Sequence, residues 1–219
     1  MIALIRYTFA TVLHTQRYLA PFLLFMGLMG VLTVNGSGPL APAYASSAGA
    51  LFVCSTWLTI ALMSLDDPPQ RAIVVITAGG RPLTVLLAAI GTALLSCLVL
   101  MVFGLLFPLW MGDYVVTTVD LLVGLEAQLT CALIGIAIGV LCSRLVFRRQ
   151  GYGLVAALAL VMGALFVKGM PPVNRLFTLM STTPDAEELL APAGIMLAIS
   201  VVILAMFTAA TQFVAGRRE

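Results

Sequence analysis

Residues 83–111, LTVLLAAIGTALLSCLVLMVFGLLFPLWM, form a run of 29 residues without a charged side chain. A helix needs about 20 mostly apolar residues to cross the ~30 Å hydrocarbon core of a bilayer. The whole chain has the same character, since its 219 residues are 62% hydrophobic and 9% charged. Its mean hydropathy is +1.13. The eleven basic and nine acidic residues are too few to cover a soluble protein of this size, so the sequence predicts an all-α integral membrane protein.

The rest of the chain contains five further apolar stretches of span length. Little sequence remains between them, so residues 1–219 are expected to form a single transmembrane domain without a soluble one. The run at 83–111 is overlong and contains Gly91, Gly104 and Pro108, which predicts tilt or an interfacial end. We place the six spans at residues 18–35, 46–65, 83–111, 121–143, 151–167 and 193–215.

The basic residues indicate how these spans are oriented, because Lys and Arg near span ends are retained on the cytoplasmic side. With the N-terminus inside, only Lys168 and Arg175 fall outside, and six spans return the C-terminus to the cytoplasm. The predicted topology is therefore N-in and C-in, in a cell membrane, most simply the cytoplasmic membrane of a bacterium. The nine basic residues that fall inside are Arg6, Arg17, Arg71, Arg81, Arg144, Arg148, Arg149, Arg217 and Arg218.

Residues 1–17 are amphipathic when placed on a helix. Ile2, Ile5, Phe9, Val12 and Leu13 lie within an arc of about 100°, with polar residues filling the remainder. This pattern predicts an interfacial elbow helix with its apolar arc in lipid. An alternative is a signal sequence cleaved near 43–45, where Ala-Tyr-Ala resembles a small-residue cleavage site.

Catalytic residues are scarce in this chain. Its one histidine, His14, has no nucleophile near it in sequence, and Glu126 is the one acidic residue within a predicted span. The sole lysine, Lys168, does not follow a Gly-rich turn, so the chain has no phosphate-binding P-loop. A net charge of +2 without a basic stripe disfavours nucleic-acid binding. We therefore expect neither an enzyme nor a resident cofactor or metal, and any ATP hydrolysis would occur in another chain.

We interpret the cysteines and small residues of the spans as packing residues. No cysteines are in a C-x-x-C spacing, which argues against a disulfide framework or metal cluster. Gly135 and Gly139 form a small-x-x-x-small pattern that permits close approach of two helices. The four cysteines are Cys54, Cys97, Cys131 and Cys142.

The loop 66–82, DDPPQRAIVVITAGGRP, has signals for a short cytoplasmic helix. Asp67 is a suitable N-cap, Pro68 suits the first helical position, and Gly79-Gly80 predicts a left-handed stop. Residues 73–76, Ile-Val-Val-Ile, give this helix an apolar flank. The flank could be buried in a groove of a partner protein or rest on lipid headgroups, and the sequence leaves both open.

These features together resemble the ABC-2 type exporter permeases. The resemblance consists of an interfacial N-terminal helix, six spans in about 220 residues, and an acidic pair ending span two before a short helix. Residues 45–67 and 133–167 are similar in layout to the compact haem-exporter permease of cytochrome c maturation. Asp66-Asp67-Pro68-Pro69 stands where that family usually has Glu and Gly.

The resemblance implies a permease subunit that exports a small hydrophobic or amphipathic molecule, such as a drug, lipid or haem. Two permease chains, identical or homologous, would pair, and separate P-loop ATPase subunits would bind ATP and Mg and grip residues 66–82 as a coupling helix. The alternatives are the substrate-capture subunit of a vitamin importer and a non-transporting membrane scaffold. The residues expected to couple to the ATPase are Asp66, Asp67, Arg71, Ile73, Ile76, Gly79 and Arg81.

Two further regions are candidates for function. Residues 168–192 resemble the outer re-entrant half-helices of these exporters, with a plain extracellular loop as the alternative. An acidic residue inside a span is costly and therefore a functional candidate. Glu126, with Gln128 beside it, is a candidate for the substrate pathway, although Glu126 lies near enough to the outer end of span four to reach headgroups or Arg175.

Overall fold

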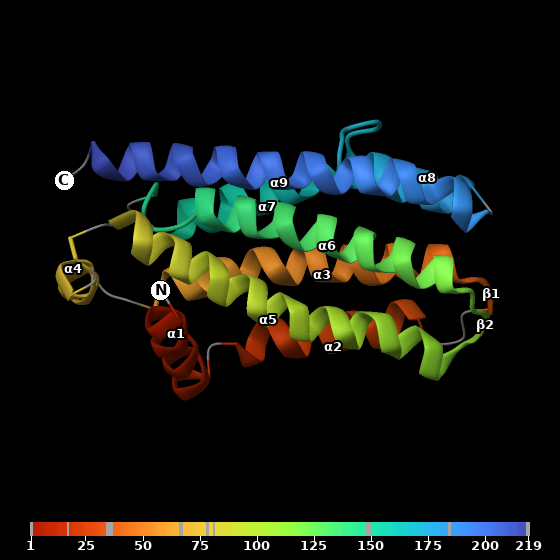
Figure 1. The fold of residues 1–219 in the computed structure, drawn as a ribbon, viewed down its shortest axis with the longest axis horizontal. Coiled ribbons are helices and arrows are strands. Elements are labelled where there is room, and N and C mark those ends of the chain that lie inside the picture. Colours follow the sequence, from red (N-terminus) through yellow and green to blue (C-terminus); the bar gives the residue numbers. More distant parts are fainter. Residues whose placement is uncertain are drawn as a thin grey trace.

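The computed structural model is a bundle of helices that run along one common direction (Figure 1). It describes residues 2–16, 18–33, 37–65, 68–77, 79–80, 82–147, 150–183 and 185–217. In these residues two short strands, β1 (Ser37–Pro39) and β2 (Asp113–Val115), accompany the helices. The helices are α1 (Ile2–Thr15), α2 (Leu19–Thr33), α3 (Leu40–Met63), α4 (Pro68–Thr77), α5 (Pro82–Met111), α6 (Thr118–Leu141), α7 (Gln150–Phe166), α8 (Val173–Thr182) and α9 (Ala186–Gly216).

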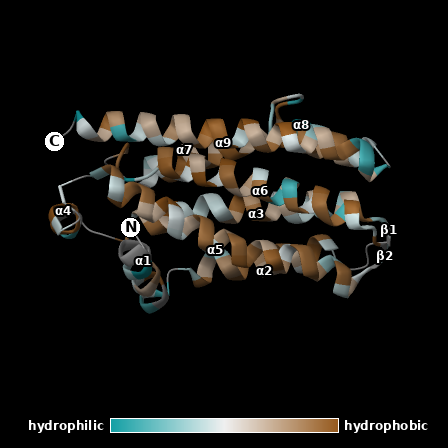
Figure 2. Ribbon diagram, in the orientation of Figure 1, coloured by the Kyte–Doolittle hydropathy of each residue, from teal (hydrophilic) through white to brown (hydrophobic). Residues whose placement is uncertain are grey.

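Four of the described helices, α3, α5, α6 and α9, are long and apolar enough to cross a membrane, with 24 to 31 residues each. The apolar helices α2 and α7 are shorter, at 15 and 17 residues. Hydrophobic residues dominate the middle of the long helices in Figure 2. The structure thus has the make-up of an all-α, multi-pass membrane protein. The number of six spans stays a prediction.

The two ends of the bundle carry different elements. Helices α1 and α4 and the C-terminal end of α9 lie at one end, which we call the α4 end (Figure 1). The strands β1 and β2, the end of α8 and the start of α9 lie at the other, which we call the strand end. The α4 end therefore gathers the elements that the charge pattern predicts to be cytoplasmic. The orientation itself rests on that pattern.

The centre of the bundle is the packing of α3 against α6. A methyl group at Gly135 would overlap Ser55 Oγ and lie 2.8 Å from the carbonyl oxygen of Phe52. At Gly139 it would lie 2.5 Å from Thr59 Cβ. The small-x-x-x-small pattern is therefore confirmed as a close approach of two helices. We call these four residues, Ser55, Thr59, Gly135 and Gly139, the α3–α6 seam.

The N-terminal helix differs from its sequence-based interpretation. Helix α1 forms at residues 2–15, but Val12 on its apolar arc is only 3% exposed and packs into the bundle core. Phe9 and Val12 line an apolar cavity of about 160 Å³ together with Leu58 of α3 and Leu100 of α5. The prediction that the apolar arc lies in lipid is thus wrong for Val12, because the bundle offers it an apolar surface.

The segment 168–192, expected to form re-entrant half-helices or a plain loop, contains the short helix α8 and the first turns of α9, and its re-entrant character stays a prediction. Helix α8 begins and ends within it and buries Val173, Leu176 and Met180. Residues 186–192 belong instead to α9, which starts seven residues before the predicted span. Glu187 and Glu188 lie in its first turn, where the helix dipole favours negative charge.

The strand end holds contacts that hydropathy does not predict. The loops before α3 and α6 pair as a two-stranded parallel sheet, with Gly38 opposite Tyr114. Helix α6 then starts with a capping box, in which the Asp120 N–H donates to Thr117 Oγ1 at 3.3 Å and the Thr117 N–H donates to Asp120 Oδ2 at 3.0 Å. Tyr44, at the signal cleavage site considered above, is fully buried in α3.

Candidate functional site

The short helix α4 is built as the sequence predicts. It begins at Pro68 and ends at Thr77, and a Schellman motif follows it. The Gly79 N–H donates to the carbonyl of Ile76 at 3.1 Å, and the Gly80 N–H donates to that of Val75 at 2.8 Å. Both glycines have positive φ angles, +85° at Gly79 and +73° at Gly80. Glycine adopts this conformation without the strain that a Cβ would bring, so the two residues end the helix sharply.

Two isoleucines of α4 are exposed. Ile73 and Ile76 have 62% and 73% of their surface accessible, whereas Val74 and Val75 are half-buried. The isoleucines are three residues apart and therefore neighbours on the helix surface. Helix α4 lies at the extreme of the bundle, where it contacts the start of α5 (Figure 1). The apolar flank predicted from residues 73–76 is thus present, and its isoleucines face outward.

The charged residues predicted to work with this helix are only partly described. Asp66, Asp67 and Arg81 lie outside the described residues, as does the side chain of Arg71. Their role in coupling stays a prediction. Gly79 is described, and it forms the stop that sets the length of α4.

Gln128 is fully buried on the face of α6 toward α3 and α5. Its Nε2 donates to Ser47 Oγ of α3 at 3.1 Å, while its Oε1 has no hydrogen-bonding partner in the described residues. The amide lies over Gly104 of α5, where a Cβ would be 2.8 Å from Nε2. Near it, Tyr44 Oη donates to the carbonyl of Leu105 at 3.3 Å. Polar side chains of α3 and α6 therefore reach the backbone of α5 at one point.

Glu126 faces a different helix. Its Oε1 lies 3.7 Å from the position of a Cβ on Gly194, which places the carboxyl group between α6 and α9. Its Oε2 is buried and has no hydrogen-bonding partner in the described part of the chain. Arg175, exposed on α8, is therefore not a hydrogen-bonding partner of this buried oxygen, and the contact of Glu126 with headgroups stays a prediction. Glu126 and Gln128 are two residues apart on a helix and point to opposite sides, so they do not form one pathway lining.

The sequence did not predict the hydrogen bond of Gln128 to Ser47 or the packing of the Gln128 amide against Gly104. Nothing in the local pattern marks Ser47, because its neighbours in space come from other helices. Gly104 carried one signal, since it precedes Pro108 by four residues. Proline has no N–H to donate to the carbonyl four residues earlier, and this leaves the Gly104 carbonyl without its usual helical partner.

The cysteines and the histidine were the remaining candidates for a catalytic or metal site. All four cysteines are buried and unpaired, and His14 is exposed on α1. Within the described residues, no group of three or more His, Cys, Asp and Glu side chains is placed to hold a metal ion.

The comparisons with known proteins give no relative from which a role could be transferred. No family model matches the chain, and neither a curated protein nor a solved structure matches it. A function is therefore inferred from the arrangement of the bundle and of α4.

Proposed function

We propose that the chain is the transmembrane permease subunit of an ATP-binding-cassette exporter of the ABC-2 type. In this role it moves a small hydrophobic or amphipathic molecule across the cell membrane. ATP and Mg are bound by separate P-loop ATPase subunits, and a second permease, identical or homologous, completes the pore.

The observation that supports this proposal most is the exposed pair Ile73 and Ile76 on a helix at the end of the bundle that stops in a Schellman motif. Helix α4 is joined at both ends to long helices, α3 before it and α5 after it. A push on α4 is thereby transmitted directly to two helices of the bundle. An ATPase groove that covers both isoleucines would remove apolar surface from water, which is the main source of association energy between proteins.

The size of this contribution can be worked from the exposed surface. Fully burying an isoleucine side chain is worth roughly 1.5–3 kcal/mol. Ile73 and Ile76 are 62% and 73% exposed, so covering their accessible surface contributes about 2–4 kcal/mol in total. Because about 1.4 kcal/mol corresponds to a tenfold change in affinity, loss of both side chains should weaken the complex roughly 30- to 700-fold.

The test is co-expression of the chain with the P-loop ATPase encoded beside it, followed by purification in detergent and titration of the ATPase. The Ile73→Ser/Ile76→Ser variant should lose the complex and should not stimulate ATP hydrolysis in proteoliposomes. Two control variants should retain the complex and the stimulated ATP hydrolysis. Ile73→Leu/Ile76→Leu keeps the apolar surface, and Gln70→Ala changes an exposed polar residue of the same helix.

The outcomes separate the proposals. If the unchanged chain binds no ATPase, the chain is not a permease of this kind, and the scaffold alternative gains support. If the serine variant binds and stimulates the ATPase as the unchanged chain does, α4 is not the coupling element.

A further inference from the structure

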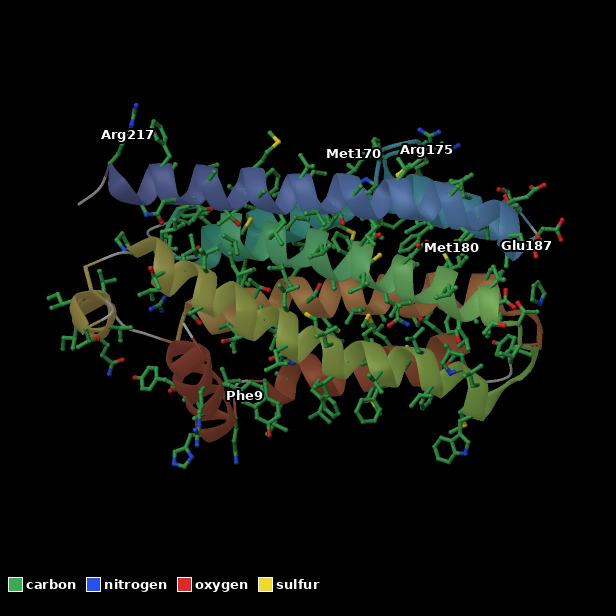
Figure 3. The ribbon with its side chains drawn as sticks, viewed as in Figure 1. Phe9, Met170, Arg175, Met180, Glu187 and Arg217 are labelled. Carbon is green, nitrogen blue, oxygen red and sulfur yellow. The ribbon has the colours of Figure 1, made fainter. Side chains whose placement is uncertain are left out.

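Two basic residues depart from the charge pattern of the chain. Of its eleven basic residues, Lys168 and Arg175 are the two that the predicted topology places outside. Both are exposed, and they lie close together in sequence at the junction of α7 and α8. This junction emerges from the side of the bundle rather than from its end (Figure 1). Figure 3 shows Arg175 beside Met170 at this point, with Glu187 at the strand end.

Lys168 and Arg175 line the same hollow, which has a volume of about 890 Å³. Asn174 and Thr178 add polar groups to its wall, and Leu165 and Leu179 give it an apolar part. None of the described residues that line it is acidic. Its charge is therefore positive, and it suits an anion.

Hydrogen bonds hold the loop that carries Lys168. Asn174 Nδ2 donates to the carbonyl of Leu165 at 2.6 Å, and the Gly169 N–H donates to Asn174 Oδ1 at 2.9 Å. The Met170 N–H donates to the carbonyl of Val167 at 3.2 Å. One side chain of α8 thus bridges the end of α7 and the loop. This fixes the loop backbone on either side of Lys168.

A second, more apolar groove adjoins the hollow. Its volume is about 590 Å³, and it runs between α2, α3 and α8, with Leu28, Val53 and Phe177 among its lining residues. Leu165 and Thr178 line both the groove and the hollow. A basic hollow that opens into an apolar groove matches a molecule with an anionic head and a hydrocarbon chain.

We propose that the hollow and the groove form a binding site for an anionic phospholipid of the bilayer. The phosphate lies between Lys168 and Arg175, and an acyl chain lies in the groove along α8. Arg and Lys donate charge-assisted hydrogen bonds to phosphate oxygens, which neutral donors match only weakly. In the predicted topology the lipid comes from the outer leaflet. The site does not depend on the coupling of α4 to an ATPase.

Native mass spectrometry of the full chain in neutral detergent measures the binding of phosphatidylglycerol. This tests the part of the site formed by Lys168 and Arg175. A basic residue near an anionic lipid surface contributes about fivefold in affinity, so Lys168→Gln/Arg175→Gln should bind phosphatidylglycerol about 30-fold more weakly. The matched control is Arg6→Gln/Arg217→Gln, which makes the same change in net charge at two exposed residues elsewhere. The control should bind as the unchanged chain does.

A second pair of variants tests the groove. Ala45→Trp fills the groove that Ala45 lines and should weaken both phosphatidylglycerol and phosphatidylcholine. Val201→Trp places the same side chain on an exposed position of α9 and should weaken neither. Inorganic phosphate should not displace phosphatidylglycerol, because it lacks the chain that fills the groove.

Several outcomes would overturn the proposal. Equal losses in the two charge variants would mean nonspecific attraction, and displacement by inorganic phosphate would mean a site for a free anion. Unchanged binding in Lys168→Gln/Arg175→Gln would remove the basis of the site. If Ala45→Trp does not fold, the charge variants decide, since both basic residues are exposed and their replacement leaves the core intact.

Discussion

The α3–α6 seam should not accept even one added methyl group at its glycines. In Gly139→Ala the new Cβ would lie 2.5 Å from Thr59 Cβ and 3.0 Å from the carbonyl oxygen of Thr56. The optimal separation of two carbon atoms is about 3.5–4.0 Å, so the helices would have to separate by about 1 Å or more. In Gly135→Ala the new Cβ would also overlap Ser55 Oγ.

Two effects of opposite sign determine how much each seam substitution changes the free energy of unfolding. Overpacking a tight core destabilises by about 1–3 kcal/mol, and here part of the obstruction is helix backbone, which cannot rotate away. Alanine is also a better helix former than glycine, by about 1 kcal/mol in a helix interior. Gly27→Ala on α2 and Gly163→Ala on α7 gain only the helix propensity, because no atom beyond the local helix backbone lies within 4 Å of either new Cβ. The difference between seam and control variants should therefore be about 1–3 kcal/mol.

The measurement is unfolding of the purified chain in mixed detergent micelles with increasing dodecyl sulfate, followed by circular dichroism. Gly135→Ala and Gly139→Ala should unfold at lower dodecyl sulfate than the unchanged chain, and Gly27→Ala and Gly163→Ala should unfold at equal or higher concentration. Adding Ser55→Ala to Gly135→Ala should recover part of the loss, since it removes the Oγ atom. If the seam variants are as stable as the controls, α3 and α6 do not approach as closely as described.

Three further changes have defined outcomes. Gln128→Met removes a buried oxygen without a partner but also the bond from Nε2 to Ser47 Oγ, so the two effects offset and the change should stay within about 1 kcal/mol in the same unfolding assay. Asn174→Ala loses the two bonds of this side chain to Leu165 and Gly169, so limited proteolysis should cut the loop 167–172 at least several times faster. Asp120→Ala removes half of the capping box with Thr117 and should destabilise by about 0.5–2 kcal/mol, measured by thermal unfolding in detergent.

Elements with a local cause could be predicted from the sequence. The long helices follow from apolar runs of span length, because a helix satisfies the backbone hydrogen bonds of such a run within the bilayer. Helix α4 follows from Pro68 at its start and from Gly79 and Gly80 after its end, and the structure places all three there. The close packing at Gly135 and Gly139 could also be predicted locally, because two glycines four residues apart leave one helix face without side chains.

Features that depend on distant residues could not be predicted. The pairing of Gly38 with Tyr114 joins loops that lie far apart in the chain and have no strand-like pattern. The bond from Gln128 to Ser47 joins residues 81 positions apart. The start of α9 at Ala186 does not follow from hydropathy, because a helix can begin before its apolar span, although Glu187 and Glu188 suit the first turn of a helix.

The bundle combines a tightly packed pair of helices with a neighbour that has fewer constraints. Helices α3 and α6 approach through glycines, so their backbones lie close together along the α3–α6 seam. Helix α5 follows α4 directly, has many exposed side chains, and contains Pro108, which removes one backbone hydrogen bond at Gly104. Gln128 lies against α5 at this glycine. On the proposed function, a force on α4 would act on both α3 and α5. Helix α3 would move together with the closely packed α6, and α5 would bend against that pair at Gly104.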